Sequence, residues 1–202
     1  MSSQLFSPFT MRGMTIDNRT IVSPMCEYSA DNGNATDWHL MHLGQFATSG
    51  IGLVITEAAA VEPRGRITAQ DLGIWCDDNE EALGRVMRFC REYGQAKMGI
   101  QLAHAGRKAS THRPWEGRDP LKEGAGAWKT ISSSANPQGE GWHTPQSMDR
   151  VEMDVVRDAF VEATKRSDRL GFDMIEVHGA HGYLLHEFLS PIANTRNDEY
   201  GG

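Results

Sequence analysis

An excess of basic charge, paired cysteines and long apolar runs are all missing from this sequence, and each absence removes a class of protein. Lysine and arginine together number 20 against 27 aspartates and glutamates, so the formal net charge is −7. A chain with this acidic balance has no electrostatic footprint for nucleic acid or for an anionic membrane surface. No apolar run approaches the roughly 20 residues that a helix needs to cross a bilayer. We therefore predict neither a nucleic-acid partner nor a membrane partner.

Cysteine is scarce as well. The three cysteines, Cys26, Cys76 and Cys90, are odd in number and far apart, which argues against a disulfide framework and for reduced thiols. The first residues carry no basic region followed by an apolar one, so no signal peptide is expected. These features predict a cytoplasmic protein.

What the sequence does contain is an alternation of strand and helix patterns. A hairpin is predicted within residues 1–18. Buried strands are predicted at 19–23, 51–56, 98–102 and 172–177. Helices are predicted from Thr36 to Gly50, at 79–93, from Asp149 onward with Val155, Phe160, Ala163 and Leu170 on the apolar face, and at 184–189. Strand followed by helix, repeated four times, predicts a parallel sheet with helical crossovers.

One long segment interrupts this alternation. Residues 104–148 are rich in Gly, Pro, Ser and Trp and show no clear periodicity. A loop of this length inside a compact domain is usually functional. We interpret it as a loop or capping insertion.

The stretch after the last strand carries the most chemistry. His178, His181 and Tyr183 follow strand 172–177 within six residues. Two neutral imidazoles can each donate a hydrogen bond to one carbonyl oxygen, and a phenol stays protonated at neutral pH. Together they could polarise a conjugated carbonyl and protonate the carbon framework. Two alternatives stay open: a zinc site that also uses His186, and two loop histidines beside a packing tyrosine.

The other unusual residues also fall at predicted strand ends. Cys26, Ala58 and Gln101 each lie at the carboxyl end of a strand, as His178 does. A (β/α)8 barrel concentrates its chemistry at that edge. Strand alternation turns Glu176 inward. Because a buried carboxylate needs a partner, we expect an arginine from another strand beside Glu176.

Several motifs together resemble the old yellow enzyme family. They are Ser23-Pro24-Met25-Cys26-x-Tyr28, Gln101-Leu102-x-His104-Ala105-Gly106-Arg107, the run from His178 to Pro191, and Asn197-Asp198-Glu199-Tyr200-Gly201-Gly202. Members of that family are FMN-dependent ene-reductases on a TIM barrel. Cys26 and Tyr28 resemble the thermophilic-like subgroup, which includes xenobiotic reductases.

The resemblance implies a role for each matching residue. The implied flavin-contacting positions are Ser23, Pro24, Met25, Cys26, Ala58 and Gln101. His178 and His181 would bind the carbonyl or nitro oxygen of an α,β-unsaturated substrate. Tyr28 would close over that substrate, and Tyr183 would donate the proton. NADPH or NADH would reduce the FMN, and no metal is expected.

The resemblance also implies that residues 1–202 are the N-terminal part of a single FMN-binding TIM-barrel domain. They would supply the hairpin and roughly strands 1–4, with the insertion at 104–148. The complementary C-terminal half, or the remainder of the chain, is then an expected partner. The complete protein is expected to be a homo-oligomer.

Two alternatives to the ene-reductase reading stay open. One is a dienoyl-thioester reductase of the same family. The other is a non-catalytic half-barrel that binds a complementary half. The yellow colour of bound flavin would separate catalytic from non-catalytic readings.

Overall fold

A computed structural model describes residues 3–201, and its centre is a four-stranded parallel sheet in the order β3-β4-β5-β8. The strands are β1 (Phe9–Met11), β2 (Met14–Ile16), β3 (Ile21–Val22), β4 (Leu53–Ala60), β5 (Lys97–Ala103), β6 (Ile131–Ser132), β7 (Gln146–Ser147) and β8 (Met174–Val177). The helices are α1 (Asp37–Ala47), α2 (Asp77–Tyr93), α3 (Arg150–Arg169) and α4 (Leu184–Leu189). Residues 1, 2 and 202, which the expected hairpin region and the last motif include, lie outside the described residues.

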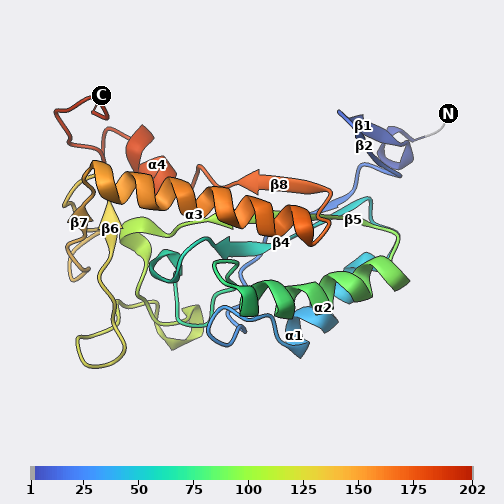
Figure 1. The fold of residues 1–202 in the computed structure, drawn as a ribbon, viewed down its shortest axis with the longest axis horizontal. Coiled ribbons are helices and arrows are strands. Elements are labelled where there is room, and N and C mark those ends of the chain that lie inside the picture. Colours follow the sequence, from blue (N-terminus) through green and yellow to red (C-terminus); the bar gives the residue numbers. More distant parts are fainter. Residues whose placement is uncertain (1–2, 202) are drawn as a thin grey trace.

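The two ends of the sheet differ in what surrounds them. Figure 1 shows β4 and β8 pointing toward the end of the molecule that carries α4, β6 and β7, while the β1–β2 hairpin lies at the opposite end. The carboxyl ends of the parallel strands therefore open among loops, where parallel α/β sheets place their ligands.

Local sequence explains where the helices begin and end. Thr36 is the N-cap of α1, in a capping box with His39, whose Nδ1 accepts the Thr36 N–H at 2.9 Å. Asp149 caps α3 by accepting the Glu152 N–H at 2.9 Å. The N-terminus of α2 carries acidic residues in its first turn, and Gly94 is its C-cap. Both predicted N-caps, Thr36 and Asp149, are thus confirmed.

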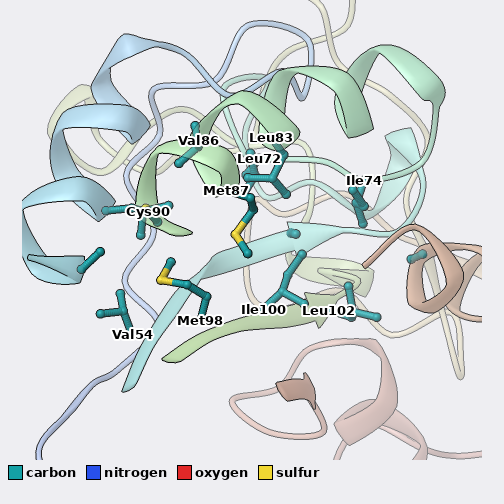
Figure 2. Packing of buried hydrophobic residues seen from close by; sticks show 14 of the residues in the cluster. Val54, Leu72, Ile74, Leu83, Val86, Met87, Cys90, Met98, Ile100 and Leu102 are labelled. Carbon is teal, nitrogen blue, oxygen red and sulfur yellow. The ribbon is translucent and has the colours of Figure 1, made fainter. Parts of the chain in front are cut away.

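The core lies between the sheet and α2. Met98, Ile100 and Leu102 alternate along β5, and all three are fully buried. Figure 2 shows this row on the strand with side chains of α2 packed above the sheet, Met87 and Cys90 among them. Alternation along a strand places such residues on one face.

Three burial predictions were wrong in detail. The strand predicted at 19–23 spans only Ile21–Val22, and neither residue is buried. Ile21 is 46% exposed, because β3 is an edge strand of the sheet. On α3, Val155 is 47% exposed and Val156 is buried instead, whereas the other predicted face residues, Phe160, Ala163 and Leu170, pack against the core. Val177 of β8 is 55% exposed, because β8 is the other edge.

The long segment 104–148 is a loop with islands of order. Its β6 pairs in parallel with β7. Residues 111–120 form a small hairpin, closed by an antiparallel bridge between Thr111 and Pro120 and by the His112 N–H donating to the Asp119 carbonyl at 2.9 Å. Among residues 3–201, no helix has the length and apolar character that crossing a bilayer requires.

Candidate functional site

The carboxyl ends of β4, β5 and β8 bring three of the predicted site positions together. Ala58 of β4 pairs with Gln101 of β5, and Gln101 pairs with Glu176 of β8. His178 follows β8 and donates its main-chain N–H to the Leu102 carbonyl at 2.9 Å. The predicted convergence of Ala58, Gln101 and His178 at one edge of the sheet therefore corresponds to adjacent strands.

The histidine turn is compact. The ring centroids of His178 and His181 lie 5.2 Å apart, and the ring centroid of Tyr183 lies 5.2 Å from that of His178. His178 is buried, whereas His181 is exposed. The two imidazoles are thus close enough to share one ligand oxygen, with the phenol ring beside them.

Burial sets the protonation of this turn. The pKa of His178 is lowered, first by burial and then by His181, so its imidazole is neutral at physiological pH and keeps one N–H to donate. Burial raises the pKa of Tyr183 to about 12, with the neighbouring Cys26 thiol contributing. The phenol therefore keeps its proton at neutral pH and can donate it.

A lysine from the long loop holds this turn in place. His181 adopts a left-handed φ of 57°, which is uncommon for a residue with a side chain. Lys108 Nζ donates to the His181 carbonyl oxygen at 2.9 Å and lies 4.6 Å from the centroid of the Tyr183 ring. Lys108 could not be predicted from local sequence, because 73 positions separate it from His181.

The expected arginine beside Glu176 is not there. Glu176 Oε1 instead accepts a hydrogen bond from Gln101 Nε2 at 2.8 Å. The alignment of the two strands explains this partner, because Gln101 and Glu176 are directly paired across β5 and β8. At that separation the Gln101 amide reaches the Glu176 carboxylate without a longer side chain. Gln101 is therefore oriented by Glu176.

Cys26 and Tyr28 lie in the loop after β3. Burial raises the pKa of the Cys26 thiol to about 12, helped by the charges of Asp71 and Glu57. Cys26 is thus a neutral thiol, not a thiolate nucleophile. Tyr28 has a left-handed φ of 49°, and its ring meets that of Trp115 edge-on with centroids 5.8 Å apart.

Beneath this loop lies a buried cluster that the sequence analysis did not single out. His39 Nε2 and Glu57 Oε1 are 3.0 Å apart, and both side chains are fully buried. Glu57 Oε2 accepts the main-chain N–H of Glu27 at 3.1 Å. Glu57 therefore anchors the loop that carries Cys26 and Tyr28. The Thr36-x-x-His39 capping box was the only local signal for His39.

The same cluster has the composition of a metal site. One ligand atom each from Glu27, His39 and Glu57 lies within 4.8 Å of the others. However, His39 Nδ1 accepts the Thr36 N–H, which leaves the ring proton on Nε2, facing Glu57. His39 then has no lone pair to offer a cation, so the cluster is a hydrogen-bonded support.

The zinc alternative for the histidine turn also loses support. His186 Nδ1 accepts the main-chain N–H of Gly182 at 2.7 Å, so His186 closes its own turn. Within residues 3–201, no three ligand atoms of this turn lie together as a metal would require.

The residues at the strand ends fit the edge of a flavin ring. Gln101 gives one amide hydrogen to Glu176, which leaves its amide oxygen and second hydrogen for a ligand. Across residues 3–201, no hydrogen bond satisfies the main-chain N–H of Met25 or Cys26. These donors and acceptors suit a heterocycle with alternating carbonyl and N–H groups.

Comparisons with known proteins agree on one family. The profile of the NADH:flavin oxidoreductase / NADH oxidase family matches residues 4–202. The NADH:flavin oxidoreductase FG08077 of Gibberella zeae is 47% identical over 206 residues, which is 100% of this chain and 49% of the relative. The NADPH dehydrogenase of Bacillus cytotoxicus is 46% identical over 204 residues, covering 100% of this chain and 54% of the relative.

Solved structures support the same assignment. The structure of morphinone reductase in complex with tetrahydroNAD superposes with a TM-score of 0.83 at 26% identity, covering 100% of this chain and 56% of that one. The chain thus spans about half the length of the relatives that it matches. The hairpin and four parallel strands confirm the predicted fold class, an α/β chain that supplies the first strands of a (β/α)8 barrel.

Proposed function

The chain belongs to the NADH:flavin oxidoreductase / NADH oxidase family, whose flavin is FMN, and from that membership we propose that the protein is an FMN-dependent ene-reductase. It would use NADPH or NADH to reduce C=C bonds conjugated to a carbonyl or nitro group. The observation that carries this proposal is the cluster of His178, His181 and Tyr183 at the carboxyl end of β8. Substrates and reductant are proposals for the complete protein.

The residues that would hold the flavin come from three strand ends. They are Ser23, Pro24, Met25, Cys26, Ala58 and Gln101. When bound, FMN supplies the hydride that is transferred to the substrate. The chain would present these groups already oriented, because Gln101 is held by Glu176 and the Cys26 loop is held by Glu57. Preorganised donors of this kind cost no reorganisation when the ligand binds.

His178 and His181 bind the substrate oxygen. A neutral imidazole donates one hydrogen bond, and two donors aimed at one oxygen stabilise the negative charge that develops there as the conjugated system accepts a hydride. The lowered pKa of His178 keeps this group a neutral donor. Tyr28, at the other side of the opening, would cover the substrate.

Tyr183 gives the proton to the α-carbon of the substrate. Its pKa of about 12 keeps the phenol protonated, while the charge on the substrate oxygen makes the α-carbon basic. Loss of a general acid typically slows the step that it serves by about 100- to 10,000-fold. The histidines and Tyr183 therefore act on different atoms of the substrate.

The test is Tyr183→Phe in the full-length protein, followed by stopped-flow measurement of the two half-reactions. Reoxidation of the reduced enzyme by 2-cyclohexenone should slow by about 100-fold or more, whereas reduction by NADPH should keep its rate. Tyr93→Phe is the matched control, because Tyr93 is an exposed residue of α2. Reoxidation of Tyr183→Phe at the wild-type rate would remove Tyr183 from the mechanism.

A second variant separates binding from protonation. His178→Ala should weaken the binding of phenol, since a phenolate mimics the charged substrate oxygen, while Tyr183→Phe should leave phenol affinity nearly unchanged. Equal losses in both variants would contradict the division of roles.

A further inference from the structure

The rim of the site carries cationic charge that the proposed reduction does not use. Lys108 is half-buried beside Tyr183, and within residues 3–201 no carboxylate lies within ion-pairing distance of it. Over that range, no carboxylate lies within ion-pairing distance of Arg118 either, at the tip of the 111–120 hairpin. The formal net charge of the chain is −7. Two cations at one opening that form no ion pair with a carboxylate therefore indicate an anionic ligand.

The hairpin is built to present its tip. The Thr111–Pro120 bridge closes it, the Leu121 N–H donates to the Ser110 carbonyl at 2.8 Å, and Arg118 has a left-handed φ of 62°. Trp115 is 64% exposed and packs edge-on against Tyr28. The hairpin therefore brings a flat apolar surface and a cation to the side of the site where Tyr28 lies.

The charge of Arg118 reaches the site. Burial raises the pKa values of Tyr28 and Tyr183, and the charge of Arg118 opposes that rise. Burial, and then the charge of Arg118, lower the pKa of Lys108. Asp71 acts more strongly than Arg118 on both tyrosines, but none of the nearby acidic groups forms an ion pair with Arg118 in the described chain. Asp71 is buried and hydrogen-bonded to Thr68, Glu187 is buried and accepts the Arg107 N–H, and Asp119 makes no ion pair in the described chain.

We propose that Lys108, Arg118 and Trp115 form an anion-binding mouth, which recognises a carboxylate or phosphate group on the ligand that enters the His178–Tyr183 site. The inference rests on the proposed function and adds the ligand class. Arg and Lys bind these groups through charge-assisted hydrogen bonds. The anion comes from one of two sources: a substrate that carries a carboxylate, or the phosphate that distinguishes NADPH from NADH.

The experiment compares matched ligands in the full-length protein. For the carboxylate source, calorimetry measures the binding of 4-methylphenol and of 4-hydroxyphenylacetate, which share a phenol and differ in a carboxylate. For the phosphate source, stopped-flow flavin reduction measures the apparent Kd of NADPH and of NADH. The variants are Arg118→Gln, Lys108→Gln and the charge-conserving Lys108→Arg.

The matched control is Arg113→Gln. Arg113 lies on the same hairpin, over the same Trp115 ring, but its charge is already paired with Glu116 at 2.5 Å. Loss of one charge-assisted hydrogen bond corresponds to about a 10-fold weaker Kd. We expect that loss for the anionic ligand of a pair in Arg118→Gln and Lys108→Gln, with less than about 2-fold change in Arg113→Gln.

The outcomes distinguish the two sources of the anion from each other and from failure of the inference. A loss confined to 4-hydroxyphenylacetate assigns the mouth to the substrate, and a loss confined to NADPH assigns it to the reductant. Equal changes for both members of each pair, or none, overturn the inference. Lys108→Arg should retain affinity for the anionic ligand, which shows that the charge is what acts. The calorimetric arm needs no turnover, so an enzyme that binds these ligands but reduces no enone would refute the proposed function alone.

Discussion

β4 and β8 are parallel strands of one sheet, yet they differ in nearly every physical respect. All eight residues of β4 are buried, and none of the four residues of β8 is. β4 lies between β3 and β5, whereas β8 forms the edge. Both strands supply residues of the candidate site, so one part of it lies on a fully buried strand and the other on a strand that is an edge within residues 3–201.

The polar residues of the two strands repeat this difference. Glu57 of β4 is held by His39 and by the main chain of Glu27 in a fully buried position. Glu176 of β8 is partly exposed and holds Gln101 by one hydrogen bond. The histidine turn after β8 depends instead on Lys108, from another loop. The comparison indicates that the Cys26 side is fixed by the fold, while the His178 side is fixed by side-chain contacts.

The largest expected loss of stability comes from removing the Glu57 carboxylate on the buried side. Glu57→Ala leaves the His39 Nε2–H and the Glu27 N–H without acceptors inside the protein, and removing one partner of a buried pair costs about 3–5 kcal/mol. Glu176→Ala should cost less, about 1–3 kcal/mol, because it leaves only one hydrogen of the buried Gln101 amide without an acceptor. Urea unfolding of both variants measures the difference. Equal losses would show that the two strands are equally supported.

A matched pair of valines sharpens the same comparison. Val54 of β4 is fully buried and Val177 of β8 is 55% exposed. Val54→Ala should cost about 2 kcal/mol from lost burial and the cavity left behind. Val177→Ala should cost less than about 0.5 kcal/mol in the 202-residue chain. Both changes in unfolding free energy are measured from urea unfolding midpoints, provided that the dependence on urea concentration is unchanged. A larger loss for Val177→Ala would mean that β8 is covered in solution.

The sequence predicted the parts of this molecule that depend on neighbours along the chain. Thr36 and Asp149 were recognisable as N-caps, because a cap bonds residues two or three positions away. The histidine turn was recognisable because His178, His181 and Tyr183 lie within six residues. The order of strands and helices, and hence the fold class, follows from the same short-range patterns.

What could not be predicted depends on register and on distant loops. The partner of Glu176 was expected to be an arginine, but it is Gln101, 75 positions away, and only the alignment of β5 with β8 decides this. Val155 was placed on the core face of α3 in error, because Val156 lies four residues before Phe160 and is the one that is buried. Lys108 joins the site through a tertiary contact that leaves no local pattern, and the capping box with Thr36 marked His39 as a helix-start residue without indicating its contact with Glu57.

The last comparison is a pH dependence to which Glu57, on the buried side, contributes. Burial raises the pKa of Glu57 from 4.5 to about 8. Between these values the folded protein holds a proton that the unfolded chain has released, so the free energy of unfolding falls as pH rises through the window. His39 has the opposite sign, because burial lowers its pKa below 6.5. The contribution of Glu57 is therefore clearest between pH 6.5 and about 8.

Glu57→Gln tests this assignment, because it removes the titrating proton and keeps the shape of the side chain and an acceptor for His39. Unfolding free energies at several pH values in that window should fall less steeply for Glu57→Gln than for the wild type. Some slope should persist, since burial also raises the pKa values of Glu27, Asp71 and Glu187 to about 7. Glu176→Gln on the edge strand is the control and should keep the wild-type slope. If Glu57→Gln and the wild type have the same slope, Glu57 is ionised throughout, and its hydrogen-bond donors outweigh the cost of its burial.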